Sequence, residues 1–253
     1  MVAKRSRPPT ERPGVPPAAL TAFRHFSETR NVGDTHAGPY RYFDFGKPVL
    51  QTADTGWTEA GTVIYGGGLV WRMIQYHAKR GVLNGGCLVA WGIGLRGDLS
   101  ARAVTEAHPD SPWRHVPRPS CMHPFFDAVP EPTEEVVLFR HARKSEGLLC
   151  PDGIPTQQNQ GGTLRAALRF LASGATVVTN SYHGTYWALL MGRRVLCVPF
   201  SDKFARFARM PGLAGPTDWP EHLSRALSVE GWLEEARAQN RAYYRDVLDR
   251  QAR

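Results

Sequence analysis

One short segment of the chain combines residues that could do chemistry. In VVTNSYHGTYWALLMG, residues 177–192, a β-branched run stops at Asn180 and Ser181, and an apolar, helix-like stretch follows His183 and Gly184. The imidazole of histidine titrates near neutral pH, so a histidine at such a junction suits the role of a general acid. Asn180 and Ser181 could donate hydrogen bonds to an anion, or could only cap the helix. His183 is a candidate catalytic residue, and the alternative is a histidine that packs against its own helix.

Glycine-rich loops follow three further predicted strands. They read RNVGDTHAG (30–38), YGGGL (65–69) and WGIGLRGD (91–98). In open α/β sheets, ligands bind beyond the carboxyl ends of the strands, and glycine lets the backbone come close to them. The same glycines could instead form turns. The candidate ligand-binding residues in these segments and in the histidine segment are Asn31, Gly33, Gly66, Gly67, Gly68, Arg96, Asn180, Ser181 and Gly184.

Charged side chains near the loops also allow two interpretations. Asp34 could accept a proton from an attacking hydroxyl, or could cap the next helix. Arg140 is predicted to end a strand, where a guanidinium could hold a phosphate or carboxylate, or could be solvated. Arg96 and Arg118 are weaker candidates for the same role. Lys203 could reach the cleft or could begin a surface helix, and the surface is favoured.

The elements that would position these residues alternate between strands and helices, which predicts an α/β layered fold. Strands are predicted at 20–26, 48–54, 62–67, 87–94, 135–143, 176–181 and 195–200, and helices at 69–80, 163–174, where Gly174 would end the helix, and 184–192. The C-terminal segment carries an apolar stripe of Trp232, Ala236, Tyr243 and Val247, which is typical of an amphipathic helix. Trp91, Tyr186 and Trp187 are expected to lie in the core.

A change of composition divides the predicted elements into two groups. Seven prolines fall between residues 108 and 134, which indicates a connector. We therefore expect a disordered basic leader at 1–19, an N-terminal Rossmann-like domain at 20–117, a linker at 118–134 and a C-terminal Rossmann-like domain at 135–253.

Composition narrows the function classes. No apolar run is long enough to span a membrane, and the leader has no apolar segment of a secretory signal, so we expect a cytoplasmic protein. The net charge is +8, and 26 of the 31 basic residues are arginine, but no nucleic-acid-binding motif accompanies them. Four cysteines, at 87, 121, 150 and 197, match no metal or redox spacing and are expected to be reduced thiols. Neither a dinucleotide or phosphate-loop fingerprint nor a metal-ligand motif is present, so no cofactor and no metal are predicted.

Several motifs together resemble one family. NVGD, VIYGGGL, GIGL, FRHAR and VVTNSYHGTYWALLMGRRVLCVPFSDKF occur in that order and resemble the polysaccharide pyruvyl transferases over about residues 21 to 206. The resemblance implies two Rossmann-like halves that face a cleft, similar to the GT-B glycosyltransferases, here with a shortened N-terminal half. The family pattern often places arginine two residues before its histidine, where this chain has Ser181.

The resemblance implies transfer of a pyruvyl group from phosphoenolpyruvate to a sugar of a glycan, without a metal. His183 would then be the general acid or a donor ligand, Asp34 the base, and the binding candidates above, with Arg140, would hold phosphoenolpyruvate. A lipid-linked acceptor and peripheral membrane contact through the basic leader are further expectations. Two alternatives remain: a GT-B glycosyltransferase that uses a nucleotide sugar, and a non-catalytic relic that binds a glycan or a protein.

Overall fold

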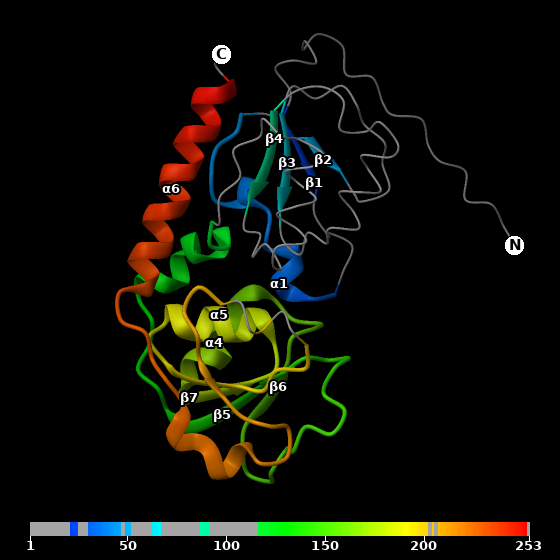
Figure 1. Ribbon diagram of the computed structural model, residues 1–253, viewed down its shortest axis with the longest axis vertical. Coiled ribbons are helices and arrows are strands. Elements are labelled where there is room, and N and C mark those ends of the chain that lie inside the picture. The colour runs from blue at the N-terminus through cyan, green and yellow to red at the C-terminus, as the bar shows by residue number, and fades with distance from the viewer. Residues whose placement is uncertain are drawn as a thin grey trace, which may run out of the picture.

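The chain forms an α/β structure with two parallel β-sheets (Figure 1). The computed structural model describes residues 21–24, 30–46, 49–51, 62–66, 87–91, 116–201, 204 and 207–251. In each sheet the strand that comes first in the sequence pairs with the second strand on one side and with the third strand on the other. The five-stranded sheet is entirely parallel and is compatible with a Rossmann-like fold.

The four-stranded sheet is built from the N-terminal part of the chain in the order β2-β1-β3-β4. Its strands are β1 Thr21–Arg24, β2 Val49–Gln51, β3 Thr62–Gly66 and β4 Cys87–Trp91. A strand is confirmed within each of the four ranges expected here from the sequence. The helix expected at 69–80 lies outside the described residues.

The five-stranded sheet has the order β6-β5-β7-β8-β9. Its strands are β5 Glu134–Arg140, β6 Thr156–Gln158, β7 Gly174–Thr179, β8 Arg194–Cys197 and β9 Gly212–Leu213. Alternate residues of β5 and β7 are buried on opposite faces: Val137 and Val177 in one core cluster, Leu138 and Val178 in another. Burial on both faces explains why these strands are continuous apolar runs.

Two helices cover one face of this sheet. Helix α4, Leu164–Ser173, buries Leu164, Ala167, Leu168 and Leu171, which is the spacing of one helical face, and Thr163 caps it by accepting a hydrogen bond from the Ala166 amide at 3.1 Å. Helix α5, Tyr182–Leu190, buries every residue except Tyr182. An all-round apolar helix needs cover on every side.

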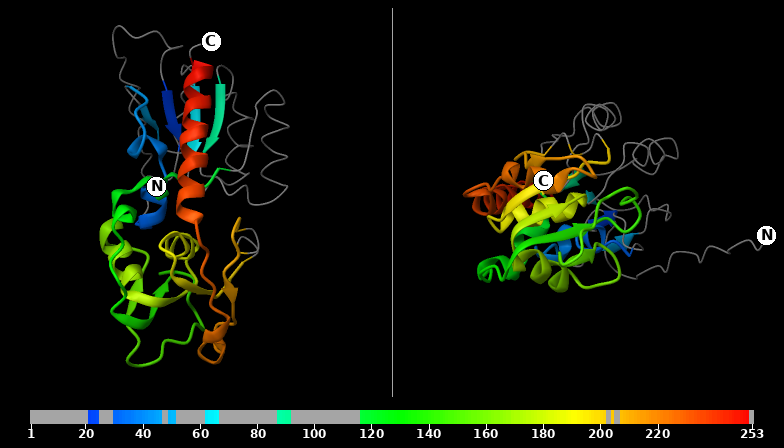
Figure 2. Two further views of the ribbon diagram at one scale, coloured as in Figure 1. Left: turned by 90° about the vertical axis from the view of Figure 1, so that its left-hand side faces the viewer. Right: turned by 90° about the horizontal axis from the view of Figure 1, so that it is seen from below.

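Helix α6, Trp232–Gln251, contributes to the cores of both sheets. Trp232 and Ala236 belong to the core of the five-stranded sheet, and Tyr243 and Val247 to that of the four-stranded sheet, so the predicted stripe is confirmed. Twenty helical residues extend about 30 Å, long enough to lie along both layers. The two views agree that α6 runs along one side of the molecule (Figures 1 and 2).

The described part of the proline-rich segment, 116–134, is packed rather than extended. It forms two 3₁₀ helices, η3 Pro119–Met122 and η4 Pro124–Asp127, and buries Cys121 completely. Side chains of α5 and α6 donate hydrogen bonds to it: Tyr186 Oη to Arg118 O (2.8 Å), Trp187 Nε1 to Ser120 Oγ (3.0 Å), Arg237 Nε to Cys121 O (3.1 Å) and Asn240 Nδ2 to Pro117 O (3.1 Å). Tyr186 and Trp187 are core residues, as expected.

The remaining described elements are short. They are α1 Val32–Thr35, η2 Pro39–Arg41 and η6 Trp219–Arg225. None of the helices in the described ranges is long and apolar enough to cross a bilayer.

Candidate functional site

Several of the predicted site residues that the structure describes follow strands at which the strand order reverses. In the five-stranded sheet the reversal lies between β5, which ends at Arg140, and β7, which is followed by Asn180 and Ser181. In the four-stranded sheet it lies between β1, followed by the 30–38 loop, and β3, which ends at Gly66. Ligands of open parallel sheets bind at this point, outside the carboxyl ends of the strands.

The start of α5 places His183 at such an end. Thr179, the last residue of β7, donates its hydroxyl to Phe139 O at 2.5 Å and accepts the Ser181 amide at 2.9 Å, which fixes the junction to β5. Ser181 caps the helix by accepting the Gly184 amide at 3.3 Å. A Cβ on Gly184 would lie 2.5 Å from Phe139 Cδ1, so the glycine lets α5 approach the sheet.

The 30–38 loop brings a carboxylate to this histidine. His183 Nε2 lies 4.0 Å from Asp34 Oδ1, and the two side chains are 6% and 24% exposed. The separation is longer than a direct hydrogen bond but shorter than two hydrogen bonds end to end. It is within the range of an ion pair between the carboxylate and a protonated imidazole. Such a pair places a group that can donate a proton beside one that can accept it.

Glycine at position 33 makes the approach possible. A Cβ added there would lie 2.0 Å from His183 Cγ and 2.1 Å from Nδ1, so the α1 backbone is in contact with the imidazole. Asn31 caps α1 by accepting the Gly33 amide at 3.0 Å. The ring of Trp187, one turn further along α5, has its centroid 5.5 Å from that of the imidazole. Backbone and indole together restrict the orientation of the ring.

Main-chain contacts connect the loop to the five-stranded sheet. The Val32 amide donates to Asn159 O at 3.1 Å, and Asn31 forms an antiparallel bridge with Gln160. Asn159 is buried just beyond β6, and its Oδ1 accepts the Ala142 amide at 3.0 Å. We did not select Asn159 from the sequence, although the Asn-Gln-Gly-Gly run that it begins was the available signal.

Two other candidates differ in their contacts. Asn180 is 2% exposed, its Oδ1 accepts the His141 amide at 2.7 Å, and its Nδ2 donates to Lys144 O at 2.8 Å, so it anchors the loop after β5. Arg140 is half-buried at the carboxyl end of β5, and its Nε has no hydrogen-bond partner in the described ranges. Of the two, the arginine has donor capacity left for a ligand.

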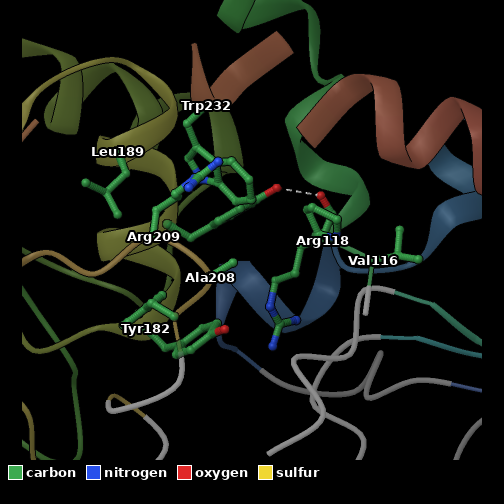
Figure 3. A pocket seen from close by; sticks show the side chains of 10 residues that line it. Val116, Arg118, Tyr182, Leu189, Ala208, Arg209 and Trp232 are labelled. Carbon is green, nitrogen blue, oxygen red and sulfur yellow. Dashed lines mark hydrogen bonds between the residues drawn. The ribbon is translucent and has the colours of Figure 1, made fainter. Parts of the chain in front are cut away.

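Arg118 is the second arginine with unused donors. Arg118 is only 6% exposed to solvent. Neither its Nε nor its Nη1 has a hydrogen-bond partner among the residues that the structure describes. Its Cζ lies 5.3 Å from the ring centroid of Tyr182, the neighbour of His183, and it lines a hollow beside α5 (Figure 3).

The remaining candidates are not placed. Gly67, Gly68, Arg96 and Lys203 lie outside the described residues, and only the strand position of Gly66 is known.

Burial controls the protonation of groups around the site. Burial raises the pKa of Cys121 to about 12 and raises the pKa of Tyr186, so both remain protonated. Burial also lowers the pKa of His36, which follows α1, and that of His123, which caps η4. Cys121, Cys150 and Cys197 are free thiols. In the described ranges, no group of three or more histidine, cysteine or acidic side chains could hold a metal ion.

No protein-family model, curated protein or solved structure matches the chain.

Proposed function

We propose that the chain is a metal-independent, ketal-forming pyruvyl transferase of the cytoplasm. Its donor is phosphoenolpyruvate, and its acceptor is a sugar of a glycan, including a lipid-linked one. The proposed architecture is GT-B-like, with two Rossmann-like halves that face a cleft. The observation that carries the proposal is the 4.0 Å separation of His183 Nε2 and Asp34 Oδ1 where strand order reverses. The order of sequence motifs is its other support.

The chemistry needs one proton donor and one acceptor close together. His183 donates a proton to the methylene carbon of phosphoenolpyruvate, which becomes a methyl group and leaves an oxocarbenium-like C2. A sugar hydroxyl adds to C2 and gives its proton to Asp34. The C2–O bond to phosphate then breaks with its electron pair, and phosphate departs. The second hydroxyl adds to C2 and gives its proton to His183, which is neutral after the first step, and this closes the ketal; Asp34 returns its proton to solvent.

The anionic groups of phosphoenolpyruvate need cationic partners. Arg140 ends β5 with an Nε that has no partner in the described ranges, on the strand beside β7, which leads to His183. A guanidinium forms charge-assisted, bidentate hydrogen bonds with carboxylate or phosphate. We assign Arg140 to the donor, with backbone approach at Gly66; the backbone of Gly33 contacts the imidazole of His183 instead.

The test is transfer to sugars that carry two neighbouring free hydroxyls. The protein is incubated with phosphoenolpyruvate in deuterated water, and the acceptor is analysed by mass spectrometry for the mass of pyruvate less one water. We expect a pyruvyl methyl group that holds one solvent deuterium, because His183 exchanges its proton with solvent. His183→Gln and Asp34→Asn should each lower the transfer rate by about 10²–10⁴-fold, the usual contribution of acid–base catalysis.

A second histidine–aspartate pair provides a matched control. His222 Nδ1 lies 3.7 Å from Asp218 Oδ2 on η6. His222→Gln should leave transfer unchanged. Full activity of His183→Gln would refute the assigned roles, and sugar transfer from a nucleotide sugar would replace the donor.

A further inference from the structure

We propose that Arg118 forms an oxyanion-binding subsite in the hollow beside α5, which takes a phosphate or carboxylate group. The hollow encloses about 20 Å³, room for about one water-sized group such as one oxygen of the anion, and it is partly open to solvent. Its walls are three α5 side chains, residues 116–118, the segment 207–209 and Trp232. The inference rests on the proposed function and deepens it, since the donor phosphoenolpyruvate carries both groups and a phosphate-linked acceptor carries one.

The buried cation of Arg118 is the main observation. A guanidinium has five N–H donors and cannot lose its charge at ordinary pH. At 6% exposure it has left most of its water, yet Nε and Nη1 find no acceptor, and no carboxylate in the described ranges forms an ion pair with it. A buried charge is costly unless it is paired and hydrogen-bonded. An oxyanion supplies the missing charge and acceptors together.

The surroundings hold the guanidinium ready for a ligand. Its Cζ lies 5.3 Å from the ring centroid of Tyr182, which stacks on Phe207 with centroids 4.4 Å apart at 13°. The backbone oxygen of Arg118 accepts a hydrogen bond from Tyr186 Oη at 2.8 Å. In Figure 3 the guanidinium of Arg118 lies on the same side of the hollow as Tyr182 and points away from Arg209. Backbone and side chain are therefore both positioned.

The other cation of the hollow is already neutralised. Arg209 Nη2 lies 2.5 Å from Glu235 Oε2, and its Cζ lies 5.7 Å from the ring centroid of Trp232. Arg209 is also exposed, whereas Arg118 is buried. The unbalanced positive charge of the hollow is thus that of Arg118.

The hollow is next to the His183 site on the same helix. Tyr182, Tyr186 and Leu189 line it, at spacings of four and three residues, which is one face of α5. His183 and Trp187 form the adjacent face, which meets Gly33. The proposed subsite and His183 thus lie on adjacent faces at the start of α5.

The test measures melting temperature with inorganic phosphate, phosphoenolpyruvate and a sugar 1-phosphate. The variants are Arg118→Met, which keeps the length of the side chain without charge, and Arg209→Met as control. We expect at least one oxyanion to raise the melting temperature of the wild type, with an affinity about 10- to 100-fold weaker in Arg118→Met. Arg209→Met should keep the shift. Without ligand, Arg118→Met should melt at the same temperature as the wild type or higher, because an unpaired charge is removed.

The three oxyanions identify the source of the group. Loss of phosphoenolpyruvate binding in Arg118→Met assigns the subsite to the donor, and selective loss of sugar-phosphate binding assigns it to the acceptor. Shifts that are equal in the wild type and Arg118→Met, or no shift with any oxyanion, would overturn the inference. If phosphoenolpyruvate binding depends on His183 but not on Arg118, the proposed Arg118 subsite is wrong and the proposed function stands. Phosphate binding that depends on Arg118, without phosphoenolpyruvate binding, would contradict the proposed function alone.

Discussion

Replacement of Gly33 by alanine tests the contact that brings Asp34 to His183. The added Cβ would lie 2.0 Å from His183 Cγ, whereas carbon atoms in contact are about 3.5–4.0 Å apart. The imidazole or α1 must therefore move by about 1.5 Å. The backbone does not oppose the change, because Gly33 is helical and its φ is not positive. Alanine is favoured over glycine in a helix by about 0.5–1 kcal/mol.

The two effects of Gly33→Ala have opposite signs. Overpacking in a filled interior costs about 1–3 kcal/mol. With the propensity gain subtracted, we expect a net loss of up to about 2.5 kcal/mol in the free energy of unfolding. A displacement of 1 Å can slow catalysis by about 10²-fold, so transfer should fall at least that far.

A double-mutant cycle assigns the effect to the imidazole. The free energy of unfolding is measured by urea denaturation for Gly33→Ala, His183→Ala and the double variant. In the His183→Ala background the methyl group enters the space that the ring leaves, so Gly33→Ala should become neutral or slightly stabilising. The expected coupling is about 1–3 kcal/mol. Gly162→Ala is the control, because a Cβ there meets nothing within 4 Å. The same loss in both backgrounds would refute the contact.

Three further predictions concern groups around the site. Burial lowers the pKa of His36 and His123 in the folded state below the ordinary value of 6.5. The folded state should therefore be most stable above pH 6.5 and should lose stability as the pH falls below that value. His123→Asn, which keeps an acceptor for the Phe125 amide, should reduce the fall in melting temperature between neutral and mildly acidic pH; an unchanged fall would contradict the assignment. Asn180→Ala should lower the free energy of unfolding by about 1–3 kcal/mol in urea denaturation, since the part-buried His141 amide loses its acceptor, and no loss would argue against the anchoring role. Exposed Cys150 should react with a thiol reagent before buried Cys121, as followed by peptide mass spectrometry; the reverse order would disagree with the burial.

The sequence was informative where local pattern and burial agree. The β7–α5 junction was predicted from a β-branched run, a Ser181 that can cap, and a helix that starts beside His183, and all three are present. The stripe of α6 was predicted equally well. The end of α4 at Gly174 is confirmed, but this glycine is not left-handed: it begins β7, where a Cβ would lie 2.5 Å from Val137 Cγ2.

Features that depend on contacts between residues far apart in the sequence could not be predicted from local sequence patterns. Strands β6 and β9 have three and two residues, too few to show a period. The proline count indicated a connector, but not the hydrogen bonds from α5 and α6 that fix it. The spacing of Arg118 in the sequence did not set it apart from other arginines. Its burial without a hydrogen-bond partner is a property of the folded chain, which local sequence cannot show. The approach of Asp34 to His183 depends on main-chain contacts of residues 30–32 with residues 159–161, and Asn159 lies 125 positions beyond Asp34.

The melting temperature with phosphoenolpyruvate, compared with UDP-, GDP- and CMP-sugars, tests the central claim most directly. At 100 times its dissociation constant, a ligand that binds only the folded state adds about 2.7 kcal/mol, which is a shift of about 5–10 °C for a chain of this size. The account predicts such a shift with phosphoenolpyruvate and its reduction in His183→Ala. A shift with a nucleotide sugar alone, or a phosphoenolpyruvate shift that is unchanged in His183→Ala, would contradict it.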